Sequence, residues 1–336
     1  MLAKCIEIWY TVWDINPKEG MSMKLSVVIP CFNEELNVAP LQEVCMKAFE
    51  GKVESYELIF VNDGSRDGTW KALKALYERH LCPVKLVNLS RNFGKESAMY
   101  AGLQKACGDY VTLLDADLQQ SPDIVLQMVE FLDNNPDFDS VAAYQENRSE
   151  GKFTSWCKKR FYRFMDKVCD VNLHEGASDF RTFRRSVAES LLSVAEYHRF
   201  SKGIFAWVGY NTHFIPYVAE PRKAGVSKWS FRKLMNYAIE GIIGYSTKPL
   251  RIATGIGTLT AFSAFLYLLI VVIQKLAFGI AIPGHATIIV LILLLGGVQL
   301  LCIGIIGEYV GRTFEQSKNR PIYLAKDVLT YKKEGA

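Results

Sequence analysis

The chain has 336 residues, half of them hydrophobic, and a formal net charge of +4 at pH 7. This length is enough for a full α/β domain and a second unit. The small positive charge argues against a nucleic-acid-binding protein. Eight cysteines without a C-x-x-C pair predict neither a zinc site nor a disulfide framework, so we expect reduced thiols in a cytosolic compartment.

The first 22 residues contain aromatic side chains, but no long apolar run followed by a cleavage site with small residues. A signal peptide is therefore not expected. We treat residues 1–22 as an N-terminal extension without an assigned role.

Residues 24–145 alternate β-type runs with helical sequence. Strands are expected at Lys24–Pro30, Glu57–Asn62, Val84–Leu89 and Tyr110–Leu114, and helices at Glu35–Phe49, Arg66–His80 and Gly94–Ala106. This alternation predicts a parallel, doubly wound sheet with its site at the carboxyl ends of the strands. The Gly-x-Gly-x-x-Gly turn of dinucleotide enzymes is replaced by PCFNE at Pro30–Glu34, which disfavours an NAD-binding function.

Two uncharged apolar runs, Ile252–Ile273 and Ala286–Gly307, follow near the C-terminus. Roughly 20 such residues span a bilayer core, so both runs are predicted to cross a membrane; buried core helices are the alternative. Basic residues crowd the outer flanks of the pair, whereas the connector holds Lys275 and His285. This asymmetry predicts that both flanks are cytoplasmic.

A further segment, Lys152–Asp170, has aromatic side chains on one helical face and lysines and arginines mostly on the other. Such a helix can lie in the membrane interface. Packing of the same apolar face on the domain core is the alternative.

The motif Asp115-Ala116-Asp117 directly follows an apolar strand. Two carboxylates in this position can hold Mg²⁺ or Mn²⁺ against a diphosphate, because these cations prefer oxygen ligands and bridge phosphate oxygens. The alternative is a pair of acidic residues that simply ends the strand.

Three other polar clusters follow the first three strands: Pro30–Glu34, Asn62–Thr69 and Ser90–Lys95. All of them are expected at the same sheet edge as the acidic pair. Gly64, Asp67 and Gly68 also fit an ordinary β-α turn with a helix cap.

Together these motifs resemble glycosyltransferase family 2, and within it the polyprenyl-phosphate glycosyltransferases, which include bactoprenol glucosyltransferases and dolichyl-phosphate mannose synthases. The resemblance extends from Met23 to about Tyr323. It implies an α/β catalytic domain of the glycosyltransferase A (Rossmann-like) type, followed by two transmembrane helices. The chain lacks the Q-x-x-R-W motif expected of a processive polysaccharide synthase.

The resemblance also implies roles for individual residues. On the donor side it implies nucleoside contacts at Pro30, Asn33, Glu34 and Asp63, contacts with the ribose and the metal-diphosphate at Asp115 and Asp117 with Gln119 in the same motif, and a basic cluster at Arg91 and Lys95. On the acceptor side it implies that Asp179 faces the reacting phosphate and that Arg199 contacts a phosphate. Asp117, Asp179 and Arg199 are thus the predicted catalytic residues.

A basic segment that contains Arg222 and Lys228 resembles a loop of the same family. Gly225 and Ser227 favour mobility, and the two basic side chains could clamp a phosphate. A solvated loop attracted to anionic headgroups is the alternative.

The predicted organisation has five parts: an extension (1–22), a cytoplasmic catalytic domain (23–229), a juxtamembrane amphipathic segment (230–248), a transmembrane hairpin (249–310) and a cytoplasmic tail (311–336). The expected function is metal-dependent, inverting transfer of a hexose from a nucleotide-sugar to a polyprenyl phosphate at the bacterial inner membrane. Glucose, UDP-glucose and undecaprenyl phosphate are the expected sugar, donor and acceptor. Mannose from GDP-mannose, an amino sugar, a hydroxyl acceptor and a non-catalytic lipid-sugar carrier remain alternatives, and a homo-oligomer is left open.

Overall fold

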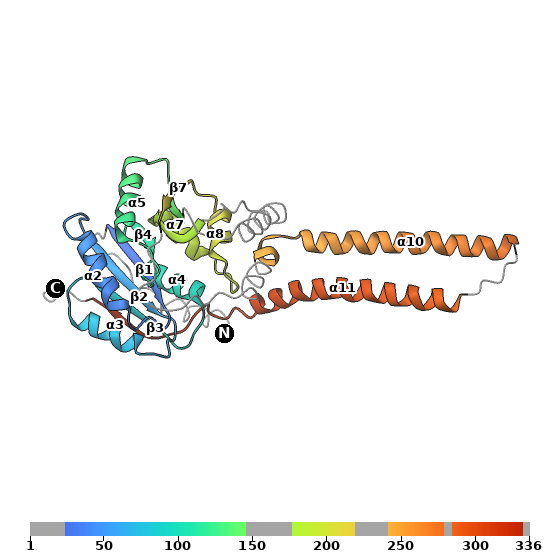
Figure 1. The fold of residues 1–336 in the computed structure, drawn as a ribbon, viewed down its shortest axis with the longest axis horizontal. Coiled ribbons are helices and arrows are strands. Elements are labelled where there is room, and N and C mark those ends of the chain that lie inside the picture. The colour runs from blue at the N-terminus through green and yellow to red at the C-terminus, as the bar shows by residue number, and fades with distance from the viewer. Residues whose placement is uncertain (1–23, 146–176, 219–240, 279–283, 332–336) are drawn as a thin grey trace, which may run out of the picture.

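The computed structural model describes residues 24–145, 177–218, 241–278 and 284–331. They form an α/β domain from which a long helical hairpin projects (Figure 1). The N-terminal extension and the predicted amphipathic helix at 152–170 lie outside the described residues, as does most of the juxtamembrane segment.

The described residues contain one eight-stranded sheet in the order β7-β5-β6-β4-β1-β2-β3-β8. Its strands are β1 (Leu25–Cys31), β2 (Tyr56–Asn62), β3 (Val84–Leu89), β4 (Tyr110–Leu113), β5 (Ser140–Gln145), β6 (Ala177–Arg184), β7 (Thr212–Tyr217) and β8 (Ala325–Thr330). The four strands predicted in the first part of the chain are confirmed to within one residue at each end. They form the parallel centre of the sheet.

The sheet as a whole is mixed, so the prediction of a parallel sheet is wrong beyond this centre. Strand β6 runs antiparallel to β4 and β5, and β8 runs antiparallel to β3. Most of β8 is exposed, because it is an edge strand, and its sequence therefore lacks the apolar pattern that predicts a buried strand. The tail predicted at 311–336 accordingly contains a strand of the catalytic domain.

Helices cover both faces of the sheet. One face carries α2 (Val38–Phe49), α3 (Thr69–Glu78) and α5 (Pro122–Asn134), and the other carries α4 (Lys95–Leu103), α7 (Arg185–Ser193) and α8 (Ser201–Trp207). Because side chains alternate along a strand, Val27 and Ile29 of β1 pack in the first layer and Val28 packs in the second. The doubly wound architecture is confirmed.

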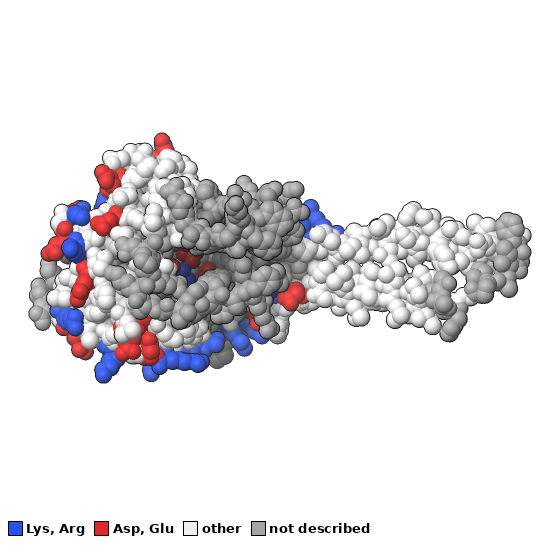
Figure 2. All heavy atoms as spheres, viewed as in Figure 1, with Lys and Arg blue, Asp and Glu red and all other residues white. Residues whose placement is uncertain are grey.

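The hairpin consists of α10 (Lys248–Phe278) and α11 (His285–Ser317), which contain the two predicted apolar runs. Both helices are long and apolar enough to cross a membrane. Leu276 is 82% exposed and Leu300 is 72% exposed, so these are not core helices of the α/β domain. Figure 2 shows a hairpin surface without charged side chains along most of its described length.

Candidate active site

The carboxyl ends of the parallel strands meet at one edge of the sheet. Cys31 at the end of β1 pairs with Asn62 at the end of β2, which in turn pairs with Asn88 near the end of β3. The Asn62 amide donates to the side-chain oxygen of Asn88 at 2.8 Å and so joins two strand ends. The loops that follow these strands carry most of the residues predicted to bind the donor.

The first two of these loops are bonded to each other. Asn33 adopts a left-handed backbone conformation, with φ of 58°, and its side-chain oxygen accepts the N–H of Arg66 at 2.9 Å. The N–H of Glu34 donates to the hydroxyl of Thr69 at 2.9 Å. Pro30, also predicted to contact the nucleoside, is half-buried in β1. The structure thus brings these three predicted residues together, and their contact with a nucleoside stays a prediction.

Asp63 is buried and holds the third loop. Its two carboxylate oxygens accept the N–H groups of Phe93 at 2.7 Å and Gly94 at 3.0 Å. Burial raises the pKa of Asp63, and these two hydrogen bonds oppose the rise. A Cβ atom on Gly64 would lie 2.3 Å from the carbonyl carbon of Arg91, so only glycine fits there. Asp63 therefore positions the start of α4, a role that the sequence did not predict.

Lys95, the first residue of α4, lies at the centre of the site. Its ammonium is 2.7 Å from Oδ1 of Asp115 and 2.9 Å from Oδ2 of Asp179. The antiparallel register pairs Leu113 of β4 with Arg181 of β6, so continuation of that register brings the two acidic residues opposite each other. Resemblance alone predicted a place for Asp179 in the site, and the pairing of β4 with β6 explains its location.

The charges of this cluster are strongly coupled. Burial would raise the pKa of Asp179, but the nearby lysines, Lys95 above all, hold it at about 2. Burial would lower the pKa of Lys95, but the charges of Asp179 and Asp115 outweigh it and raise that pKa. Arg181 is buried, and its guanidinium lies 3.6 Å from the centre of the Phe205 ring. Both residues of the central ion pair are thus charged at neutral pH.

The second acidic residue of the predicted metal pair lies in a tight turn. Oδ1 of Asp117 accepts the N–H of Gln119 at 3.2 Å, and Leu118 between them has a φ of 60°. Among the residues that the structure describes, no group of three or more metal-ligating side chains could hold an ion. Carboxylate oxygens are the kind of ligand that Mg²⁺ and Mn²⁺ prefer, and metal binding by Asp115 and Asp117 stays a prediction.

Glu96 also belongs to the site, although the sequence analysis did not include it. Its carboxylate accepts the N–H of Ser201 at 3.0 Å and is bonded to the Ser201 hydroxyl. Burial and the charge of Asp179 raise the pKa of Glu96 to about 7. Its place next to Lys95 was the available sequence signal, but no motif distinguishes it from an ordinary helix residue.

Arg199 makes structural contacts. Its guanidinium donates to the carbonyl oxygens of Val194 and Leu191 at the end of α7 and lies 4.5 Å from the centre of the Tyr100 ring. Burial lowers its pKa. The structure therefore gives Arg199 a capping role, and its predicted phosphate contact stays a prediction.

The remaining basic residues of the prediction differ in what the structure shows. Arg91 is exposed, and its guanidinium lies 4.5 Å from the centre of the Phe93 ring. Arg222 and Lys228 lie outside the described residues.

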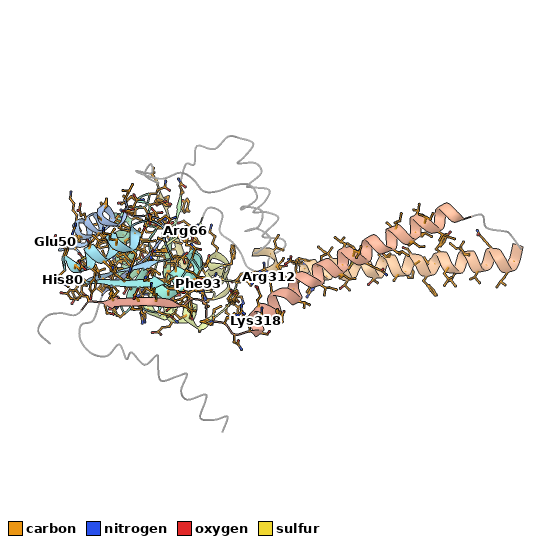
Figure 3. All side chains as sticks on the ribbon, turned by 90° about the horizontal axis from the view of Figure 1, so that it is seen from below. Glu50, Arg66, His80, Phe93, Arg312 and Lys318 are labelled. Atoms are coloured by element: carbon orange, nitrogen blue, oxygen red, sulfur yellow. The ribbon has the colours of Figure 1, made fainter. Side chains whose placement is uncertain are left out.

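The segment that precedes α8 contacts the end of α11. The side chains of His198 and Glu315 are bonded to each other, and the backbone N–H of Tyr197 donates to Gln316 at 2.9 Å. Figure 3 shows Arg312 at the end of the hairpin that adjoins the α/β domain. The C-terminal end of α11 is therefore bonded to the segment that leads into Ser201, and Ser201 in turn bonds Glu96.

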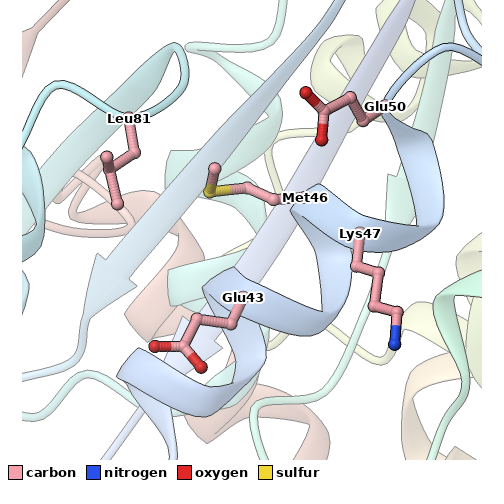
Figure 4. Close-up of a pocket in the computed structure, with 5 residues that line it drawn as sticks. All are labelled: Glu43, Met46, Lys47, Glu50 and Leu81. Atoms are coloured by element: carbon pink, nitrogen blue, oxygen red, sulfur yellow. The ribbon is translucent and has the colours of Figure 1, made fainter.

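A shallow pocket lies elsewhere, on the outer face of α2 (Figure 4). Its lining residues are Glu43, Met46, Lys47, Glu50 and Leu81. These residues belong to the second half of α2 and to the segment after α3, and the group includes none of the predicted site residues.

Two family profiles match the chain. Glycosyl transferase family 2 matches residues 26–192, which include the acidic cluster of Asp115, Asp117 and Asp179. The GtrB C-terminal hairpin matches residues 248–313, which form α10 and most of α11.

Several curated proteins are similar over most of their length. The bactoprenol glucosyl transferase of Shigella phage SfV is 39% identical over 306 residues, which cover 91% of this chain and 99% of that protein. A prophage bactoprenol glucosyl transferase homolog of Escherichia coli K12 is 39% identical over 309 residues, with the same coverage. An uncharacterized glycosyltransferase of Synechocystis is 38% identical over 312 residues, 92% of this chain and 96% of that protein. The family profile and these relatives show that the chain is a glycosyltransferase and belongs to glycosyltransferase family 2.

Proposed function

We propose that this glycosyltransferase transfers a hexose from a nucleotide-sugar to a polyprenyl phosphate at the cytoplasmic face of a bacterial inner membrane. The observation that carries the proposal is the direct connection between site and hairpin. The segment bonded to α11 through Tyr197 continues into Ser201, which bonds Glu96 beside the acidic cluster. Relatives named bactoprenol glucosyl transferases support a polyprenyl acceptor. In its specific form, the donor is UDP-glucose and the acceptor is undecaprenyl phosphate.

The proposed cofactor is Mg²⁺ or Mn²⁺, held by Asp115 and Asp117 together with the donor diphosphate. When bound, it neutralises the charge that develops on the leaving nucleoside diphosphate. The ammonium of Lys95 lies at the same cluster and adds a positive charge near the leaving group.

In this proposal the phosphate of the lipid acceptor is the nucleophile. A phosphate monoester has a second pKa of about 6, so it is largely dianionic at neutral pH and needs little help from a general base. One phosphate oxygen attacks the anomeric carbon from the face opposite the diphosphate, the bond from that carbon to the diphosphate oxygen breaks, and the configuration inverts. We assign Asp179 to orienting the reacting groups, and Arg199, Arg222 and Lys228 to the lipid phosphate.

The proposed orientation places both chain ends on the cytoplasmic side. Lys248 and Arg251 lie at the start of α10, and Arg312 and Lys318 lie at or just beyond the end of α11. Basic residues concentrate on the cytoplasmic side of membrane spans. The site would then lie near the interface where a phosphate headgroup is found, which supplies a proximity gain.

The test is an incubation of membranes that contain the protein with a panel of labelled nucleotide-sugars, with polyprenyl phosphate or polyprenol as acceptor. We expect labelled lipid from UDP-glucose with the phosphate and none with the alcohol. Transfer to polyprenol at a comparable rate would show a hydroxyl-acceptor transferase instead. Label from GDP-mannose alone would keep the acceptor and change the donor, and donor binding without turnover would favour the carrier alternative.

A further inference from the structure

The ammonium of Lys95 occupies the position between two carboxylates that a metal cation would favour. It lies 2.7 Å from Asp115 and 2.9 Å from Asp179. The backbone that carries Lys95 is held by Asp63, whose carboxylate accepts the two N–H groups directly before Lys95. The cluster therefore already has an internal cation.

This arrangement opposes the binding of a free divalent cation. A second cation on Asp115 would lie close to the ammonium that already bonds the same carboxylate, and like charges at that distance repel. The other oxygen of Asp179, Oδ1, is buried and has no hydrogen-bond partner among the residues that the structure describes. The cluster thus retains an unused carboxylate oxygen while Lys95 satisfies the adjacent one.

The Lys95 side chain can leave this position. It is 43% exposed, so it is not enclosed by the protein, and its four-carbon stem is flexible. Lysine also binds phosphate as a compact point charge. A diphosphate that arrives at the carboxyl edge of the sheet would offer the ammonium new acceptor oxygens and would supply the ligands that the cation lacks.

We propose that Lys95 makes divalent-cation binding depend on the nucleotide. Without a donor, Lys95 neutralises Asp115 and Asp179 and keeps the cation affinity low. A donor diphosphate draws the ammonium to its own oxygens, which frees Asp115 for the cation and releases Oδ2 of Asp179. The inference rests on the proposed function, because the diphosphate belongs to the proposed donor.

The thermodynamic consequence is a coupling between the two ligands. If the nucleotide raises the affinity for the cation, the cation must raise the affinity for the nucleotide by the same factor. Removal of the Lys95 charge should reduce this coupling, because the cation no longer competes with an ammonium when the nucleotide is absent.

The experiment measures Mn²⁺ binding to the full-length chain in detergent, by electron paramagnetic resonance of the free ion, first without nucleotide. We expect Lys95→Met to bind Mn²⁺ about tenfold or more tightly than the wild type, since the loss of one charge-assisted contact corresponds to about that factor. Lys95→Arg keeps the charge and should stay near the wild type. Lys52→Met is the matched control, because Lys52 pairs with Asp123 at an exposed surface position.

A second titration adds saturating UDP or GDP. The nucleotide should raise the Mn²⁺ affinity of the wild type by a larger factor than that of Lys95→Met. Thermal unfolding checks that each variant is folded, and Lys95→Gln replaces Lys95→Met if the latter is not.

Equal or weaker Mn²⁺ binding by the folded, charge-free variant in the absence of nucleotide would overturn the inference. A failure of the proposed function looks different. The wild type would then bind neither nucleotide in the presence of Mn²⁺, while the tighter Mn²⁺ binding of Lys95→Met would still support competition between Lys95 and the cation.

Discussion

The backbone N–H of Tyr197 donates to the side-chain oxygen of Gln316, 2.9 Å away, and the Gln316 amide donates in turn to the carbonyl oxygen of Ala195 at 3.3 Å. One side chain at the end of α11 thus makes two hydrogen bonds to the segment that leads into α8. That segment ends at Ser201, which bonds Glu96 in the site. A hairpin long and apolar enough to cross a membrane and a site at the sheet edge are therefore joined by a short, bonded stretch of chain.

Gln316→Ala should weaken the use of the lipid acceptor more than the use of the donor. The substitution removes both hydrogen bonds, each of which contributes about 1 kcal/mol, so the apparent Michaelis constant for polyprenyl phosphate should rise by up to roughly thirtyfold. Steady-state kinetics with each substrate varied in turn measure the effect. Ser317→Ala is the control, because that hydroxyl donates back to Phe314 within the same helix. An equal rise in both constants would contradict an acceptor-side role for this contact.

Gly64→Ala should destabilise the protein more than Gly51→Ala. Both glycines have positive φ, 60° and 69°, but an added Cβ meets the backbone of Arg91 at Gly64 and no atom within 4 Å at Gly51. Strain of the left-handed backbone costs about 1–2 kcal/mol at either position, and the clash adds about 1–3 kcal/mol at Gly64. Chemical denaturation of the two variants measures the difference. Equal losses of unfolding free energy would show that the third loop moves away from Gly64 without cost.

The centre of the fold could be predicted from sequence because its strands are apolar and buried on both faces, and those runs are hard to misread. The antiparallel strands could not. Edge strand β8 is mostly exposed. It comes shortly after the hairpin and more than 200 residues of chain after its partner β3. Nothing in its local sequence indicates that long-range pairing.

The site also has a part that the sequence predicted and a part that depends on long-range pairing. Asp115 and Asp117 follow a strand whose apolar sequence is easily predicted, so their place at the sheet edge was predictable. The contact of Asp179 with Lys95 depends on the pairing of β4 with β6, and the contact of Glu96 with Ser201 spans 105 residues. Neither pairing leaves a pattern in the local sequence.

Because the pKa of Glu96 is raised in the folded state, the free energy of unfolding should fall as pH rises. Its pKa is raised to about 7 from 4.5 by burial and by Asp179. Between these two pH values the folded state binds more protons than the unfolded state, so the free energy of unfolding falls with increasing pH. Thermal unfolding of metal-free wild type and Glu96→Gln across pH 4.5–7.5 should show this slope in the wild type and a flatter curve in the variant. Parallel curves would mean that Glu96 titrates near its ordinary pKa.

Asp117→Asn should remove most of the transfer activity and leave the fold intact. In the proposal Asp117 is a metal ligand; its side chain is half-buried, and its neighbours Ala116 and Leu118, which pack in the core, are unchanged by the substitution. Loss of one ligand that neutralises the leaving diphosphate should lower the turnover number by about a hundredfold or more, as for other groups that stabilise developing charge.

The measurement for Asp117→Asn is turnover of chelator-treated protein that has been replenished with Mg²⁺ or Mn²⁺, together with thermal unfolding. Asp123→Asn serves as the control, because Asp123 lies in the first turn of α5 and is exposed, so its loss should leave turnover near the wild-type value. An amide oxygen can still approach a cation, so higher Mn²⁺ concentrations should recover part of the lost activity if the defect is in metal binding. A folded Asp117→Asn variant with near-normal turnover would move the metal role to other residues.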